Sequence, residues 1–312
     1  MGIITRHMRA PVACLVVLIA VASAGCSAKK QLTADQFFHQ ANDDFRSGAY
    51  TLAIDNLRNL LDQHPFSPYT EEAELKIGHA HYLDGDYLSA IVSFSDFQRR
   101  HPTSPHLPFV GYHLGMCYVR QMGSIDRDQS AAQSALAYFM TLINQYPESP
   151  YAELARAELA KCRESLAAHE LYVARFYERS GNWSAARLRL LLMAAEYGDT
   201  PSAADALLKL TRNYVEGNNG EYATLAYRAL RQHHPKSEET AEARALVGAG
   251  SGKAIPPTSD PIDLLLIAHG RRRPAPNYAL PDLPRARETR PAPGPGPGMP
   301  SIDPFGHGNV GY

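Results

Sequence analysis

The sequence predicts an all-α protein in which about five pairs of helices stack side by side as a solenoid. Two observations lead to this prediction. Nearly the same stretch returns as HPFSPY (64–69), HPTSPH (101–106) and YPESPY (146–151), and a proline ends a helix because its ring disfavours the α conformation of the preceding residue. Between these stops, apolar residues recur with the spacing of one helical face. One helix pair cannot bury such a face alone, so neighbouring pairs must stack.

Residues 1–25 have the organisation of a secretion signal. Two arginines precede an apolar run over 11–24 that is too short for a good membrane span. The small residues 23–25 before Cys26 resemble the lipobox of bacterial lipoproteins, in which that cysteine is lipidated and starts the mature chain. An ordinary secretory signal cut near Cys26 is the alternative. We expect a lipid on Cys26 and an anchored linker over 26–32, because acyl chains hold a protein on a membrane.

The residue after Cys26 bears on the destination of the chain. It is Ser27 and not aspartate, and by resemblance to the sorting rule of bacterial lipoproteins this favours the outer membrane. We therefore expect a lipid-anchored body on the periplasmic face of that membrane.

The repeat unit is marked by an alanine twelve residues before each helix end. A large apolar residue follows it after four positions and another after seven, which places all three on one helical face. Glycine turns precede three of these helices, at GAY (48–50), GDY (85–87) and GNW (181–183). Two helices with a glycine turn, a small residue, and a closing proline form the tetratricopeptide signature. The alanines are Ala53, Ala90, Ala135, Ala186 and Ala223, and the ends are Pro65, Pro102, Pro147, Gly198 and Pro235.

Irregular spacing divides the solenoid into two parts. The alanines are 37, 45, 51 and 37 residues apart. In the second interval the extra residues fall around 120–133, which predicts a longer loop. The third interval contains 151–181, which has no proline and no glycine until its end and so predicts one long helix of about 28 residues. We expect repeats 1–3 over 33–150, and the long linking helix with repeats 4–5 over 151–250.

The C-terminal segment has a different composition. Residues 251–312 hold 13 of the 23 prolines and 8 of the 22 glycines. Such a segment buries too little apolar surface to offset its chain entropy, so we expect a disordered tail. Its apolar island, DLLLIAHGRRR (263–273), is either a docking segment or a transient helix.

Several function classes lack support in the sequence. The 31 lysines and arginines balance 32 aspartates and glutamates, so no basic field favours nucleic acid. His79 and His81 are two residues apart, which separates them on a helix, so no metal site is expected. The chain contains no catalytic motif, and we expect neither enzyme activity nor a cofactor. Cys117 and Cys162 occupy equivalent positions of stacked repeats, too far apart for a disulfide, so free thiols are expected.

Three stretches go beyond the general repeat pattern: HPFSPYTEEAEL (64–75), NQYPESPYAELA (144–155) and LYVARFYERSGNW (171–183). With the lipobox ahead of them, in this order, the chain resembles the BamD (ComL) family of outer-membrane assembly lipoproteins over roughly residues 26–247. The resemblance implies a non-enzymatic scaffold. Its C-terminal repeats would hold the BamA insertase and accessory lipoproteins, and its N-terminal repeats would recognise unfolded β-barrel clients of the outer membrane.

The resemblance also implies site residues. Arg189, six residues after Trp183, matches the position of a basic residue that pairs with BamA in the family, and Arg187 is a second candidate on the same helix. The first helices of such a solenoid line its concave face. Their tyrosines could therefore either pack in the core or stack on a client. We expect Tyr69, Tyr82 and Tyr112 to offer stacking surfaces to a client.

Two other classes share parts of this pattern. A generic periplasmic tetratricopeptide lipoprotein, serving envelope or polysaccharide assembly, would have the same repeats without an insertase partner. A peptidoglycan-associated cell-division coordinator would carry a coiled coil ahead of its repeats, and residues 31–45 contain no heptads.

Overall fold

The computed structural model describes residues 31–248 and 260–274, which contain twelve helices and no strand. This confirms the all-α prediction. Ten of the helices form five antiparallel pairs, one for each predicted repeat. The pairs are α2 (Ala34–Arg46) with α3 (Tyr50–Gln63), α4 (Thr70–Leu83) with α5 (Tyr87–Arg100), α6 (Leu107–Val119) with α7 (Ser130–Gln145), α8 (Pro150–Arg179) with α9 (Trp183–Tyr197), and α10 (Pro201–Glu216) with α11 (Gly220–His233).

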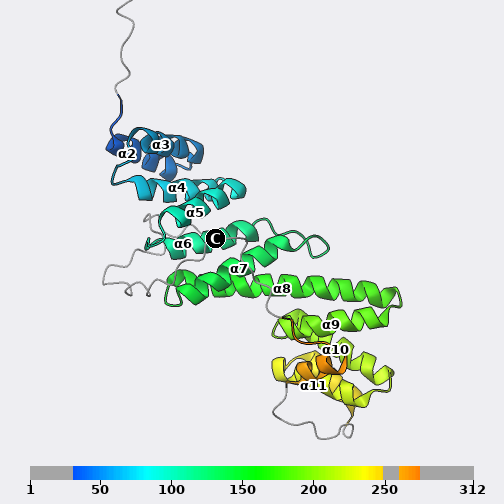
Figure 1. Ribbon diagram of the computed structural model, residues 1–312. Coiled ribbons are helices and arrows are strands. Elements are labelled where there is room, and N and C mark those ends of the chain that lie inside the picture. Colours follow the sequence, from blue (N-terminus) through cyan, green and yellow to red (C-terminus); the bar gives the residue numbers. More distant parts are fainter. Residues whose placement is uncertain (1–30, 249–259, 275–312) are drawn as a thin grey trace, which may run out of the picture.

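The pairs follow one another from α2 and α3 at one end to α10 and α11 at the other, and α8 crosses the middle of the molecule (Figure 1). With 30 residues, α8 is the long helix that the sequence predicts. The longer loop is also confirmed, since α6 and α7 are separated by residues 120–129. A further helix, α12 (Glu238–Val247), packs against α10 and α11.

Size complementarity holds the paired helices together. Each of the five repeat alanines is at most 2% exposed, as a close approach of two helices requires. In repeat 2 the residue four positions later, Phe94, lies against Gly78 of α4, where a Cβ atom would come within 2.7 Å of the ring. In repeat 3 Phe139 lies in the same way against Gly115 of α6. The large ring fits because the first helix has no side chain at that point.

In the turns between repeats, serine hydroxyls accept hydrogen bonds from backbone amides at or before the start of the next helix. Ser149 is the N-cap of α8 and accepts a hydrogen bond from the Tyr151 amide. Ser67 and Ser104 are not N-caps, because they lie two residues before Tyr69 and His106, after which α4 and α6 begin. Their hydroxyls instead accept hydrogen bonds from the amides of those two residues, inside the turn.

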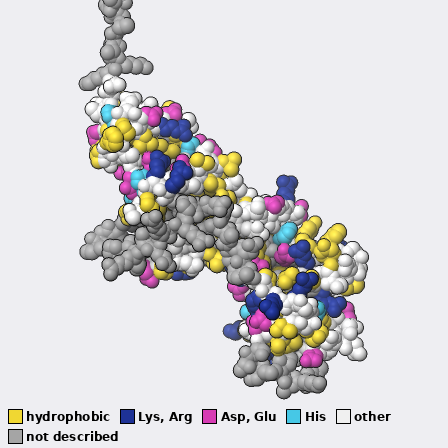
Figure 2. Space-filling view, viewed as in Figure 1, with side chains coloured by type: hydrophobic (Ala, Val, Ile, Leu, Met, Phe, Trp, Pro, Cys, Tyr) yellow, Lys and Arg dark blue, Asp and Glu magenta, His cyan; other side chains and the backbone are white. Residues whose placement is uncertain are grey.

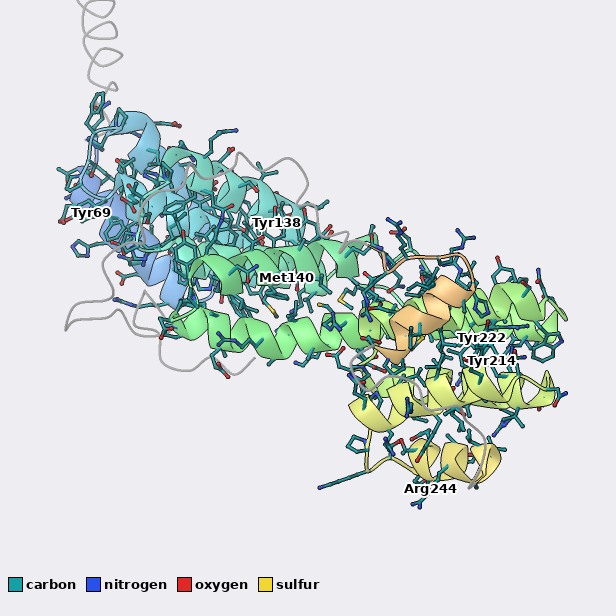
Figure 3. All side chains as sticks on the ribbon, turned by 60° about the horizontal axis from the view of Figure 1, so that its bottom comes forward. Tyr69, Tyr138, Met140, Tyr214, Tyr222 and Arg244 are labelled. Atoms are coloured by element: carbon teal, nitrogen blue, oxygen red, sulfur yellow. The ribbon has the colours of Figure 1, made fainter. Side chains whose placement is uncertain are left out.

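Part of the tail forms a helix, which corrects the prediction of disorder for those residues. Helix α13 (Pro261–Ala268) packs against α9 and α11 and buries Ile262, Leu265 and Leu266. His269, directly after it, lies beside the rings of Tyr214 and Tyr222, which Figure 3 shows under this helix. The apolar island is therefore a segment that docks on the body of the same chain, because its apolar side chains are buried against α9 and α11.

The predicted signal peptide, Cys26 and the remaining tail residues lie outside the described residues. Within the described ranges, none of the helices combines the length and apolar character needed to cross a bilayer. Cys117 and Cys162 are buried free thiols, as predicted, and burial raises the pKa of each to about 12.

Candidate partner-binding groove

A groove lies where the N-terminal and C-terminal repeats meet. Its walls come from residues 127–129 of the loop before α7, the start of α7, the middle of α8 and the second half of α9, with Pro274 beside them. It consists of two adjoining hollows of about 230 and 240 Å³. Four residues line both hollows, Gln133, Leu166, Glu170 and Tyr197. We call this feature the junction groove.

Arg189 stands in the wall of the junction groove. Its Nη1 donates to Glu170 of α8, at 2.9 Å from Oε2 and 3.3 Å from Oε1. The side chain of Arg189 is 44% exposed and that of Glu170 is 26% exposed. A pair so open to solvent contributes less than about 1 kcal/mol to stability.

Part of the Arg189 guanidinium has no hydrogen-bond partner in the described part of the chain. A guanidinium has five N–H donors in a planar fork. Only Nη1 has a hydrogen-bond partner among residues 31–248 and 260–274, which leaves Nε and Nη2 for another acceptor. This geometry can receive a second carboxylate beside Glu170, since two parallel N–H···O bonds match a carboxylate well.

Arg187 occupies a different environment from Arg189. Its guanidinium carbon lies 5.6 Å from the centre of the Tyr214 ring on α10, and its Nε is buried with no hydrogen-bond partner among the residues that the structure describes. Tyr214 itself is 1% exposed, and burial raises its pKa to about 12 although the nearby Arg187 charge acts against the shift. Arg187 therefore serves the packing of α9 on α10. The Arg187 side chain as a whole is half-buried, so the expectation that it contacts a partner stays a prediction.

The tip of the α8–α9 hairpin carries exposed aromatic side chains. Tyr172 and Phe176, one turn apart on the outer side of α8, are 41% and 56% exposed, and Trp183 at the start of α9 is 50% exposed. Figure 2 shows hydrophobic side chains gathered at this end of the molecule, with arginine and lysine side chains next to them. Exposed aromatics of this kind are enriched where proteins bind one another.

The three predicted client-stacking tyrosines do not form an open surface together. Tyr82 and Tyr112 are 6% and 4% exposed, so the prediction that their rings are available for stacking is wrong. The reason is that α4 is packed against α3, α5 and α6, and α6 against α5, α7 and α8. Tyr69 is half-buried, with one ring face stacked on Phe38 at 4.4 Å and its hydroxyl donating to Asp35.

Glu170 and Gln133 are groove residues that the repeat pattern did not indicate. A signal for Glu170 exists, because it and Arg189 are almost equally far from the Ser180–Gly181 turn of an antiparallel hairpin. Gln133 had no comparable signal, since it reaches the groove only through the stacking of α7 on α8. Among the described residues there is also no group of three or more potential metal ligands.

Comparison with known proteins places the chain in a family. The sequence model of the YfiO family, described as an outer membrane lipoprotein, matches residues 30–230. A protein of Pasteurella multocida is 31% identical over 221 residues, which are 67% of this chain and 85% of that protein. A protein of Vibrio cholerae is 30% identical over 197 residues, 59% of this chain and 82% of its own length.

A third relative, from Caulobacter vibrioides, is 28% identical over 207 residues, which are 64% of this chain and 68% of that protein. All three relatives are named outer membrane protein assembly factor BamD. The matched region contains the whole α8–α9 hairpin and therefore Arg189 and Glu170. The chain thus belongs to the YfiO family of outer membrane lipoproteins, the family of BamD.

Proposed function

We propose that this protein is a non-enzymatic scaffold lipoprotein of the outer-membrane β-barrel assembly machinery, and that it binds a BamA-like insertase through the junction groove. The observation that carries this proposal is the guanidinium of Arg189 in the groove wall, of which only Nη1 donates a hydrogen bond to a described residue. The names of the relatives support the assembly role. The stacked helix pairs supply a long rigid surface, which suits a protein that holds others in place.

The proposed contact is a carboxylate of the insertase that binds Nε and Nη2 of Arg189. Glu170 would stay on Nη1, so the guanidinium would lie between two carboxylates. The bound insertase would cover the groove, and removing one member of an ion pair buried in an interface costs about 2–5 kcal/mol of binding free energy. Accessory lipoproteins would bind the same C-terminal repeats, and the exposed aromatics of the hairpin tip are available to them.

Membrane attachment is the second part of the proposal. A lipid on Cys26 would hold the body on the periplasmic face of the outer membrane. The family description as an outer membrane lipoprotein supports this location. Replacing Cys26 by serine should release the protein from the membrane fraction or block its processing; unchanged fractionation with outer membranes would contradict lipidation.

The insertase contact is tested by copurification in mild detergent. The change is Arg189→Glu, and the recovered insertase is measured by immunoblot relative to the tagged protein. We expect recovery to fall at least about tenfold, because the substitution removes the donors and adds a repelling charge. Arg212→Glu is the matched control, since Arg212 is likewise exposed and paired with a glutamate of another helix, Glu242. This control should retain full recovery.

A charge swap separates a partner contact from an internal role. The double variant Arg189→Glu/Glu170→Arg restores an ion pair across the hairpin with its signs exchanged. Insertase recovery should stay low, because the carboxylate of the partner then meets the wrong charge. Return of recovery to the parent level would show that the pair acts only within the chain and would overturn the contact. The same experiment separates the BamD reading from a generic tetratricopeptide lipoprotein, which would recover no insertase at all.

Recognition of unfolded β-barrel clients is the third part of the proposal. Of the three predicted tyrosines, Tyr69 alone keeps its ring partly open. We expect Tyr69→Ala to weaken binding of a labelled β-strand peptide from an outer-membrane barrel, measured by fluorescence anisotropy. Tyr69→Phe should bind almost as well, since the ring is kept and only the hydrogen bond to Asp35 is lost. Equal binding by Tyr69→Ala and the parent would move the client site elsewhere.

A further inference from the structure

The joint between repeats 1 and 2 presents one phenylalanine entirely to solvent. Phe66 is 99% exposed, more than any other large hydrophobic residue that the structure describes. It lies between Pro65 and Pro68 in the turn from α3 to α4. Exposed apolar residues are common singly, so exposure alone carries no conclusion. The equivalent positions of the other repeats give it meaning.

The residue that follows the helix-ending position is polar in every other repeat. All of these equivalents are exposed, as Phe66 is. They are Thr103, Glu148, Asp199 and Lys236. The same turn therefore carries a solvent-compatible side chain four times and a phenylalanine once, in the repeat closest to Cys26.

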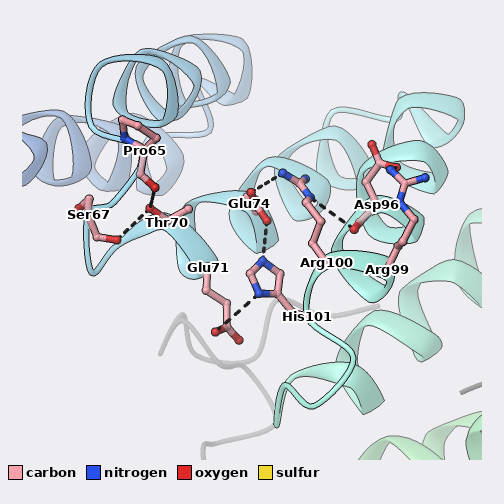
Figure 4. Close-up of polar contacts among 9 residues, drawn as sticks. All are labelled: Pro65, Ser67, Thr70, Glu71, Glu74, Asp96, Arg99, Arg100 and His101. Atoms are coloured by element: carbon pink, nitrogen blue, oxygen red, sulfur yellow. Dashed lines mark hydrogen bonds and ion pairs between the residues drawn. The ribbon is translucent and has the colours of Figure 1, made fainter. Parts of the chain in front are cut away.

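The turn around Phe66 is held rigidly. The Ser67 amide donates to the His64 carbonyl at 3.0 Å, and the Tyr69 amide donates to the Ser67 hydroxyl at 3.2 Å. The Thr70 hydroxyl reaches the carbonyls of Pro65 and Ser67, at 3.2 and 2.8 Å (Figure 4). The ring is thus presented outward on a fixed platform, so binding it would require little further ordering.

The same turn lies beside the point where the chain arrives from Cys26. His64 Nε2 is 2.9 Å from the Leu32 carbonyl oxygen, and the Tyr69 hydroxyl donates to Asp35. Leu32 is six positions after Cys26 in the sequence, and six steps of extended chain span at most about 20 Å. A lipid on Cys26 would therefore hold this turn within that distance of the membrane surface.

We infer that Phe66 inserts into the interface of the membrane that holds the lipid anchor, as a second contact that fixes the orientation of the solenoid. The inference rests on lipidation of Cys26, which is part of the proposed function. Aromatic and aliphatic side chains are buried at the boundary of headgroups and acyl chains. The exposed carboxylates Asp35 and Asp62 near the turn disfavour a strongly anionic surface, so the fitting partner is zwitterionic phospholipid.

Tryptophan fluorescence on vesicles tests this inference. The single native tryptophan, Trp183, is replaced by phenylalanine, and Phe66→Trp is introduced into that background. Thr103→Trp, the same turn position one repeat further along, is the matched control. The lipidated proteins are reconstituted on phosphatidylethanolamine–phosphatidylcholine vesicles that contain phosphatidylcholine brominated on its acyl chains. We expect the emission of Phe66→Trp to shift to shorter wavelength and to be quenched several-fold more than that of Thr103→Trp.

The possible outcomes distinguish failure of the membrane contact of Phe66 from failure of the lipid anchor on Cys26. If the proteins do not float with the vesicles, the lipid anchor itself fails. If they float but both tryptophans are quenched equally, the membrane contact of Phe66 is overturned while the anchor stands. Protection of Phe66→Trp by an unfolded barrel protein, with no quenching by brominated lipid, would assign the ring to a protein partner and overturn the inference as well.

Discussion

In the N-terminal repeats the first helices α4 and α6 are buried along most of their length, whereas α8 in the C-terminal half keeps its outer side open. Residues 73–82 of α4 and 109–117 of α6 are all buried. On α8, by contrast, Tyr172 and Phe176 face solvent. Aromatic content alone therefore does not mark a binding surface, since the same residue types form the core of one half and lie on the exterior of the other.

The buried half contains a histidine that makes stability depend on pH. His113 is fully buried, its Nδ1 donates to the Phe109 carbonyl at 3.0 Å, and its Nε2 has no hydrogen-bond partner within residues 31–248 and 260–274. Burial lowers its pKa from 6.5 to about 4. Between these two values the unfolded chain binds the proton and the folded chain does not, so stability is present above pH 6.5 and is lost as the pH falls toward 4.

The largest expected effect follows from this histidine. A pKa difference of this size corresponds to a loss of roughly 3 kcal/mol of unfolding free energy between neutral pH and pH 4. His113→Phe should remove that part of the pH dependence, and denaturant unfolding at neutral and acid pH measures it. His81 and His106, whose pKa values are also lowered by burial, remain in both proteins. Identical pH dependence of parent and variant would contradict the burial of a neutral His113.

The next effect concerns the glycine–phenylalanine contacts of the buried half. Gly78→Ala should lower the unfolding free energy by about 1–3 kcal/mol, because the added methyl overlaps the Phe94 ring. Gly123→Ala is the control, since its Cβ would meet Arg127 at an ordinary 3.6 Å. The double variant Gly78→Ala/Phe94→Leu should lose less unfolding free energy than the sum of the losses of the two single variants, because the smaller leucine leaves room for the added methyl group. Repeats 1 and 4 already have leucine at this position, four residues after the repeat alanine. If the losses of unfolding free energy simply added, the contact between residues 78 and 94 would not depend on their relative size.

The smallest expected effect lies in the open half. Arg189→Glu should change the unfolding free energy of the isolated protein by less than about 1 kcal/mol, because the Arg189–Glu170 pair is exposed. Thermal unfolding followed by circular dichroism measures this. A large loss of stability would mean that Arg189 holds the hairpin together, and a binding defect of the variant would then not indicate a partner contact.

Helix pairs, turns and the long α8 could be predicted from the sequence because each is set by local signals. Proline and glycine end the helices, and the repeat alanine with its apolar partners reports one helical face. Helix α13 could not be predicted as docked, because proline-rich surroundings hide it and its partner surface on α9 and α11 is far away in the sequence. Composition describes a segment alone and says nothing of a groove that receives it.

The site was predictable only in part for a similar reason. Arg189 follows from a pattern match and proved to be exposed, as a partner contact requires. Tyr82 and Tyr112 were placed on the correct helices, but the pattern could not show that later helices cover them. Arg187 differs from Arg189 only by its angle on α9 and by the position of Tyr214 on α10. The burial of these side chains depends on how the repeats stack. The periodicity of one helix gives no information on that stacking.

Site-specific photocrosslinking in cells tests most directly the claim that the insertase occupies the junction groove. A photoreactive amino acid is placed at Gln133, which is exposed and lines both hollows, and separately at Leu88 of α5, which is 70% exposed in the N-terminal half. We expect an adduct with the insertase from position 133 and none from position 88. An insertase adduct from position 88, with none from position 133, would contradict it.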